Sequence, residues 1–147
     1  MFKHTVVGES DVLGALTKLR NVAVGSKLNR PLEKGAEELR RAIVAEIEKQ
    51  GLVESGDLKR SVKVRILGFE IEVFSDLEYS AIHEFGGTIT AKNAPALMFR
   101  TSDGRFATVD SVYIPARPYF RPGIENGKAL LIAIVSEAIA TIIEGMF

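Results

Sequence analysis

The spacing of apolar residues changes abruptly between residues 50 and 62, and this change constrains the fold more than any other feature of the chain. Before it, apolar positions recur every three or four residues among charged side chains, as on one face of an α-helix. These positions are Leu32, Ala36, Leu39, Ile43 and Ile47. After it, apolar and charged residues alternate as in half-buried β-strands. The pattern predicts a long helix near residues 30–50 followed by a β-hairpin at residues 62–74.

The ends of the long helix and the turn of the hairpin also carry sequence signals. Asn29 is the expected N-cap, and Gly51 is the expected residue that closes the helix. In the hairpin, a turn at Leu67 and Gly68 would place Arg65 opposite Glu70 and Lys63 opposite Glu72, so that charge pairing and alternation agree. Because Leu67 adopts a positive φ poorly, a bulge or a register one residue away stays open.

The remaining elements are expected from shorter patterns. A short strand at residues 3–7 and a helix over Asp11–Asn21 precede the long helix. Residues 88–113 mix short extended runs with turn signals, which predicts a hairpin-rich loop that is mobile before assembly. Three prolines predict an extended approach to a last helix near residues 120–144, with Pro31 and Pro122 each in the first turn of a helix. No linker divides the chain, so residues 1–147 are expected to form a single domain.

The last helix is apolar enough to raise the question of a membrane span. Glu137 interrupts it, and the uninterrupted apolar part, residues 129–135, is too short to cross a bilayer. We therefore expect this helix to be buried on several faces, including against another subunit, and we expect no membrane. The amino terminus lacks a signal-peptide core, which favours synthesis in the cytoplasm, and the chain has no cysteine for disulfides or thiolate metal sites.

The charges are balanced overall but unevenly distributed. Up to Leu67 the chain has 13 lysines and arginines against 9 acids, a net charge of +4, and the remainder has 6 against 10, a net charge of −4. Nucleic-acid-binding proteins usually have a stronger basic excess, so no specific nucleic-acid recognition is expected. The distribution fits complementary surfaces on neighbouring subunits better.

The segment "YSAIHEFGG", residues 79–87, contains the residues that most resemble a catalytic or metal site. A zinc-protease helix needs a second histidine four residues after the first, and that position is Gly87. The chain's other histidine, His4, makes no metal-binding spacing with His83. Neighbouring helical residues point about 100° apart, so His83 and Glu84 make a poor acid–base pair. No serine stands in a nucleophile elbow, and the sequence predicts no catalytic, metal or cofactor site.

The same segment is predicted to be a capped helix. Ser75 and Glu78 form a capping-box pattern, and Gly86 is placed to end the helix in a left-handed conformation. The helical period predicts that one side faces inward, namely Leu77, Ala81, Ile82 and Phe85. The opposite side is expected to be exposed or to contact a neighbouring subunit, and it contains Asp76, Tyr79, Ser80 and His83.

Three motifs follow one another along the chain: "SGDLKRSV", which predicts a short turn before a strand, then "YSAIHEFGG", then "IPARPYFRPGIE". In this order and spacing they resemble the tailed-phage neck proteins grouped as tail-completion, head–tail joining or virion-morphogenesis proteins. The matching positions are Ser55, Gly56, Leu58, Lys59 and Ser61, then Tyr79, His83, Glu84, Phe85, Gly86 and Gly87, then Pro115, Ala116, Arg117, Pro118, Phe120 and Pro122. The sequence departs from the family pattern at Ser80, Tyr119 and Gly123, which puts local packing in question.

The resemblance implies an α+β fold in which the two long helices pack a small antiparallel sheet. It also implies a non-enzymatic subunit that assembles into a homo-oligomeric ring between head and tail, in contact with portal or adaptor proteins on one side and tail-terminator or tail-tube proteins on the other. Such a protein would reside in the virion after assembly in the host cytoplasm. Arg117 and Arg121 are expected to fix the proline-rich segment against the helix start or a neighbouring carboxylate. The alternatives are a tail-terminator or tail-tube-related subunit, and a small hydrolase that uses His83 and Glu84.

Overall fold

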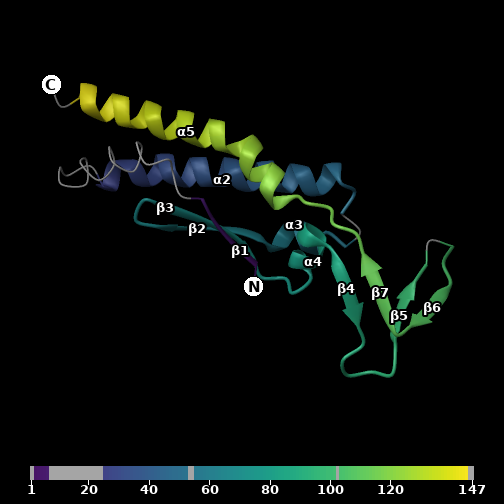
Figure 1. The fold of residues 1–147 in the computed structure, drawn as a ribbon. Helices are drawn as coiled ribbons and strands as arrows, with labels where there is room; N and C mark the ends of the chain where they lie inside the picture. The colour runs from purple at the N-terminus through teal and green to yellow at the C-terminus, as the bar shows by residue number, and fades with distance from the viewer. Residues whose placement is uncertain (1, 7–24, 53–54, 102, 146–147) are drawn as a thin grey trace.

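The computed structural model of the chain describes residues 2–6, 25–52, 55–101 and 103–145. The predicted helix over Asp11–Asn21 lies outside these residues. The α+β class is confirmed, and Figure 1 shows the arrangement of the elements. Their bounds are β1 Phe2–Val6, α2 Gly25–Lys49, α3 Asp57–Ser61, β2 Val62–Leu67, β3 Glu70–Ser75, α4 Ser80–Phe85, β4 Gly87–Thr90, β5 Leu97–Arg100, β6 Phe106–Val109, β7 Ser111–Ile114 and α5 Phe120–Glu144.

Helix α2 forms the middle layer, with α5 packed along one side and the sheet of β1, β2 and β3 on the other (Figure 1). The predicted apolar stripe is buried and extends one turn further back than expected, to Leu28. The predicted N-cap at Asn29 is wrong, because α2 begins at Gly25 and Pro31 lies inside it. The complete burial of Leu28 offsets the backbone hydrogen bond that Pro31 cannot donate.

The predicted end of α2 at Gly51 is confirmed. Gly51 has a φ of +70°, its N–H donates to the Glu48 carbonyl at 3.0 Å, and the Leu52 N–H donates to the Ile47 carbonyl at 3.0 Å. These two bonds form the Schellman arrangement, which satisfies carbonyl groups that the end of the helix would otherwise leave unpaired.

Helices α2 and α5 approach so closely that glycine is required at their crossing. A Cβ atom on Gly123 would lie 2.5 Å from the Ile43 Cα, and one on Gly127 would lie 2.9 Å from the Leu39 Cδ1. The buried face of α5 continues through Leu131 and Val135 at four-residue spacing. The presence of Gly123, where the resemblance led us to expect alanine, therefore follows from contact between the two backbones.

The sheet has the order β1-β3-β2 and is antiparallel throughout. The hairpin at 62–74 is confirmed, and its register is the one that the sequence left open, one residue away from the charge-paired one: Arg65 lies opposite Glu72, and Leu67 lies opposite Glu70. The turn is formed by Gly68, with a φ of +65°, and Phe69, whose φ is not positive. Positive φ at only the first turn residue fits a type II′ turn, which accepts glycine there, so the turn centre moves one residue along the chain.

The charged residues of the hairpin accordingly find other partners than the predicted ones. The Arg65 Nε donates to the Glu72 Oε2 at 2.7 Å, and the guanidinium lies over the Phe74 ring, 5.2 Å from its centre. Lys63 pairs with Asp76 just after the strand instead of with Glu72.

Helix α4 is shorter than predicted, and Ser80 and Phe85 lie on the opposite sides from those predicted, whereas Asp76 and Tyr79 are exposed as expected. Ser75 does not cap it: Ser75 ends β3, is fully buried and shares a 2.7 Å hydrogen bond with the Ser61 hydroxyl. The helix begins only at Ser80, which is buried together with Glu84, whereas Phe85 is 58% exposed. The reason is that α4 packs through its polar side against the start of α5, as described below.

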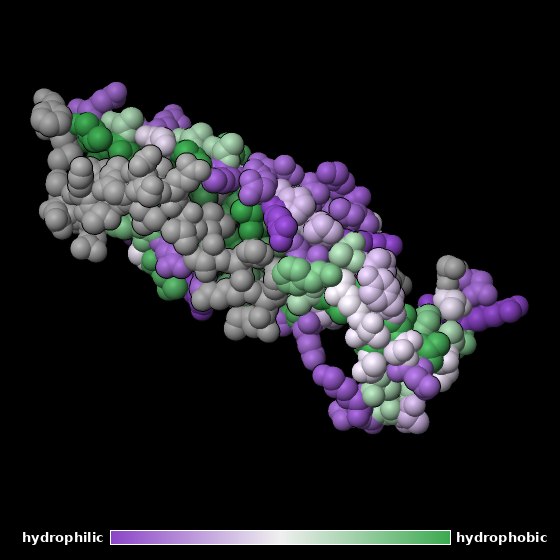
Figure 2. Space-filling model, viewed as in Figure 1, coloured by the Kyte–Doolittle hydropathy of each residue, from purple (hydrophilic) through white to green (hydrophobic). Residues whose placement is uncertain are grey.

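Residues 87–114 form an arm of two antiparallel ribbons, β4 with β7 and β5 with β6, that projects from the helical body (Figure 1). The prediction of a hairpin-rich stretch is confirmed. Large apolar side chains remain at its surface, where Figure 2 shows apolar residues at lower right: Met98, Phe99, Phe106 and Tyr113 are all exposed.

Candidate functional site at the junction of the three motifs

Glu84 caps the start of α5 from a distant part of the chain. Its carboxylate accepts hydrogen bonds from the backbone N–H groups of Tyr119 at 2.7 Å, Phe120 at 2.9 Å and Arg121 at 3.1 Å. These are groups that the first turn of a helix leaves without internal partners, and a negative charge is favourable at this end of the helix dipole. Glu84 is therefore a structural residue that joins the second motif to the third.

A signal for this cap is present near the start of α5, although the sequence prediction did not use it. The residue before α5 is Tyr119, whose side chain makes no capping hydrogen bond, and no serine, threonine, aspartate or asparagine stands near the helix start. A long helix without a local cap needs acceptors from elsewhere, and a carboxylate in another motif can supply them.

Tyr119 and Phe120 anchor the same junction from the core. Both are fully buried, with ring centres 5.1 Å apart, and the Tyr119 hydroxyl donates to the Ser80 carbonyl at 3.5 Å. Burial, followed by the charge of Glu84, raises the pKa of the Tyr119 phenol well above its ordinary value. The phenol stays neutral and serves as a packing group.

The proline-rich segment of the third motif crosses the end of α4. The Arg117 N–H donates to the His83 carbonyl at 2.7 Å, and a Cβ atom on Gly86 would lie 2.7 Å from the Ala116 nitrogen. Gly86 has a φ of +71° and a ψ of 177°, so it ends α4 with the predicted positive φ but leads straight into β4. At this position glycine is needed both for its conformation and for the close approach.

Arg117 and Arg121 act on this junction through their backbones. Both donate an N–H group, to the His83 carbonyl and to Glu84 respectively, as described above. Their side chains are exposed, and neither guanidinium forms a salt bridge within the described part of the chain. The role predicted for the guanidinium groups stays a prediction.

The three motifs meet around a polar pocket of about 350 Å³. The first motif contributes Ser55 and Leu58, the second contributes Tyr79 and His83, and the third contributes Arg117. The end of α2 completes the wall with Gly51 and Leu52. Residues that are widely separated in the sequence thus form one surface feature, which explains why the motifs occur together.

His83 is partly buried within the chain, where the sequence predicted an imidazole that is exposed or contacts a neighbouring subunit. Its Nδ1 atom is buried without a hydrogen-bond partner among the described residues, and its ring meets the Tyr79 ring edge-on with centres 5.8 Å apart. Burial first, and then the positive charge of Arg117, lower the pKa of the His83 imidazole below its ordinary value. The imidazole is therefore neutral at pH 7.

His83 and Glu84 do not form a catalytic pair in this arrangement. The Glu84 carboxylate is buried and accepts three backbone hydrogen bonds, so it is not free to exchange protons with a substrate. In the described residues, no group of three or more histidine, aspartate or glutamate side chains is arranged to hold a metal ion.

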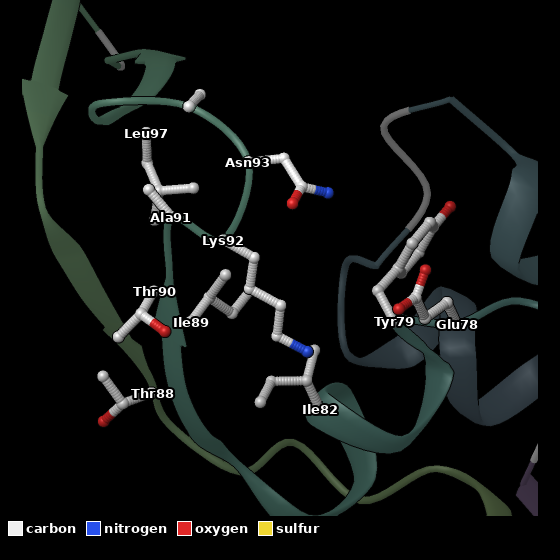
Figure 3. Close-up of a pocket in the computed structure, with 11 residues that line it drawn as sticks. Glu78, Tyr79, Ile82, Thr88, Ile89, Thr90, Ala91, Lys92, Asn93 and Leu97 are labelled. Atoms are coloured by element: carbon white, nitrogen blue, oxygen red, sulfur yellow. The ribbon is translucent and has the colours of Figure 1, made fainter.

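A second, less polar groove of about 620 Å³ separates α4 from the arm. Figure 3 shows Ile82 on the α4 side and Ile89 and Lys92 on the arm side extending into this groove.

By length and composition, α5 could cross a membrane, but this is weak evidence, because helices of soluble proteins also meet the same criteria. Its glycine face packs against α2, as described above.

One comparison with known proteins gives a match. The model of the phage virion morphogenesis family matches residues 31–138, well over half of the chain and all three motifs. Comparisons with curated proteins and with solved structures give no significant match.

Proposed function

The chain belongs to the phage virion morphogenesis family, and we propose that it is a ring-forming subunit that completes the tail or joins it to the head. The family supports a structural role in the assembly of the virion particle. The finer proposal concerns its place in the neck, its ring and its neighbours, which would be portal or adaptor proteins on one side and tail proteins on the other.

The observation that carries the proposal is the uncovered apolar surface of the arm. Met98 and Phe106 are 71% and 73% exposed on one face of the β5–β6 ribbon. The other face holds Phe99, which is 39% exposed. A two-stranded ribbon is barely stable on its own, and apolar side chains on both faces call for contact with another protein.

A ring built from one kind of subunit needs two different faces on each copy. The arm supplies one of them. The sides of α5 that do not pack against α2 are a candidate for the other, because Leu130, Ile132 and Ile143 are 49%, 37% and 41% exposed and flank the buried face of the helix. The two surfaces lie on different parts of the molecule, as head-to-tail contacts require (Figure 1).

Mutating the arm tests the proposal directly. We expect the purified chain to form a closed oligomer as concentration rises, measured by light scattering after size exclusion and by electron microscopy. The double variant Met98→Ser with Phe106→Ser should lose the oligomer while keeping its circular dichroism spectrum, since both side chains are exposed. Leu67→Ser is the matched control, because Leu67 is 52% exposed at the β2–β3 turn, far from the arm (Figure 1).

A chain that stays monomeric at all concentrations and binds no portal, adaptor or tail component would refute the proposal. Binding to tail-tube proteins without binding to head-side proteins would instead favour a tail-terminator role.

A further inference from the structure

We propose that the pocket between the three motifs binds a carboxylate group presented by a partner protein, and that Arg117 is the main residue that binds this carboxylate. The proposal deepens the assembly role proposed above and rests on it for the identity of the partner. It assigns a binding function to the pocket that the assembly role alone does not specify.

The charge of the pocket favours an anionic ligand. Arg117 is its one charged lining residue among those described, and the other lining groups are polar, aliphatic or aromatic. Asp57, an acid in the first motif, already pairs with Arg60 at 2.5 Å and therefore does not neutralise Arg117. A cationic wall that has no matching acid among the described lining residues favours an anionic ligand.

Arg117 combines a fixed backbone with an exposed guanidinium. The Arg117 backbone is fixed by its 2.7 Å hydrogen bond to the His83 carbonyl, and the prolines on either side of the Ala116–Arg117 pair restrict the segment further. The guanidinium itself is exposed and forms no salt bridge within the described ranges. A rigid backbone with a free planar fork is suited to bidentate binding of a carboxylate.

The pocket is better suited to a protein carboxylate than to a nucleic-acid phosphate. A phosphate backbone is bound by rows of basic residues, whereas this pocket offers one arginine and the chain has a net charge of zero. Its volume of about 350 Å³ suits a side chain better than a polymer. Acidic side chains are available on a second copy of this chain, since residues 68–147 carry 10 acids against 6 basic residues.

Binding should be coupled to the protonation of His83. Among the described residues, Tyr79 meets its imidazole edge-on, Arg117 from the β7–α5 connection acts on it by charge, and the uncharged Leu58 from α3 lines the same pocket. A bound carboxylate would offset the charge of Arg117 and raise the pKa of His83. Binding therefore takes up a proton, and affinity should increase as the pH falls from 7 towards the pKa of His83.

Nuclear magnetic resonance of the two imidazoles in the full-length chain tests the pocket itself. The probes are sodium acetate, a blocked Gly-Glu-Gly peptide and inorganic phosphate, each titrated separately. We expect acetate and the peptide to shift the His83 signals to saturation and to raise its pKa, while His4 stays unchanged. His83→Gln assigns the signals.

Arg117→Ala should weaken carboxylate binding at least tenfold, and Arg117→Lys should restore part of it. Arg121→Ala is the matched control, because Arg121 is also exposed but does not line the pocket, and it should bind as the unaltered chain does. The fold should survive Arg117→Ala, since the contact with His83 uses the backbone. Absence of any carboxylate response, saturation by phosphate alone, or equal loss in Arg121→Ala would each overturn the proposal.

The oligomer and the pocket can fail separately. If Arg117→Ala weakens the oligomer and Arg121→Ala does not, the carboxylate comes from a second copy. If the oligomer is unaffected but binding to another virion protein is lost, the carboxylate comes from that protein. A monomeric chain whose His83 still responds to acetate would refute the ring and leave the pocket standing.

Discussion

The helical body and the arm contain similar apolar residues but bury them very differently. In the body, Leu39, Ile43 and Val73 are completely buried between α2, α5 and the sheet. In the arm, Met98 and Phe106 remain more than two-thirds exposed although their strands are regularly paired. The difference lies in the second layer: the body has elements that cover both sides of α2, and the ribbons of the arm have no such cover among the residues that the structure describes.

A segment can therefore form regular secondary structure and still leave its apolar side chains unburied. The body can fold on its own contacts, and we expect the arm to gain its packing from a neighbour. Three sets of substitutions, taken in order of decreasing expected effect on the free energy of unfolding, test which contacts stabilise the chain.

The largest effect is expected from truncating the core. Ile43→Ala should lower the free energy of unfolding by about 2–5 kcal/mol, because it removes a fully buried side chain at the α2–α5 crossing. Phe106→Ala in the arm should change it by less than about 0.5 kcal/mol, since that side chain is 73% exposed. Urea unfolding followed by circular dichroism measures both. Equal losses would show that the arm contributes to the core of the isolated chain.

An intermediate effect is expected at the cap of α5. Glu84→Ala leaves three backbone N–H groups without their acceptor in a buried setting, which should cost about 1–3 kcal/mol. Glu84→Gln keeps one acceptor oxygen and should lose less. Glu78→Ala is the matched control at an exposed glutamate two residues before α4, with an expected change within about 0.5 kcal/mol. If Glu84→Ala proves as mild as the control, the cap is not a stabilising contact.

The smallest effect in this series is expected at the glycines of the crossing. Gly123→Ala should lower stability by about 1–2 kcal/mol, since overpacking against the Ile43 backbone outweighs the better helix propensity of alanine. Gly35→Ala should cost less, because its new methyl group meets the end of the flexible Leu131 side chain. Thermal unfolding of the two variants gives the comparison, and a stabilised Gly123→Ala would mean that the helices can move apart at little cost.

Local patterns in the sequence predicted most elements well. The stripe from Leu32 to Ile47, the stop at Gly51 and the helix at residues 120–144 all follow from helical period, glycine and proline. The hairpin was also predicted, but its register was left open between two choices, because the charged pairs Arg65–Glu70 and Lys63–Glu72 favoured one turn centre and Gly68 favoured another. The backbone requirement of the turn decided the register over the weak surface charge pairs.

The α4 segment shows where the same reasoning fails. Its period placed Phe85 inward and Ser80 outward, yet the structure has the reverse. A helix of six residues is too short for its own apolar face to determine its orientation. The buried hydrogen bonds between Glu84 and the start of α5 do so instead.

Short-range patterns along the chain were enough to predict most elements, the α+β class and the three motifs that identify the family, because each depends on residues close together in the sequence. The roles of the motifs, in contrast, come from long-range packing. Glu84 and the Phe120 N–H that it caps are 36 residues apart, and the pocket brings together the end of α2, residues 55–58, α4 and Arg117. Such contacts depend on how α5 packs against α2 and α4, and no spacing within a single motif encodes that geometry.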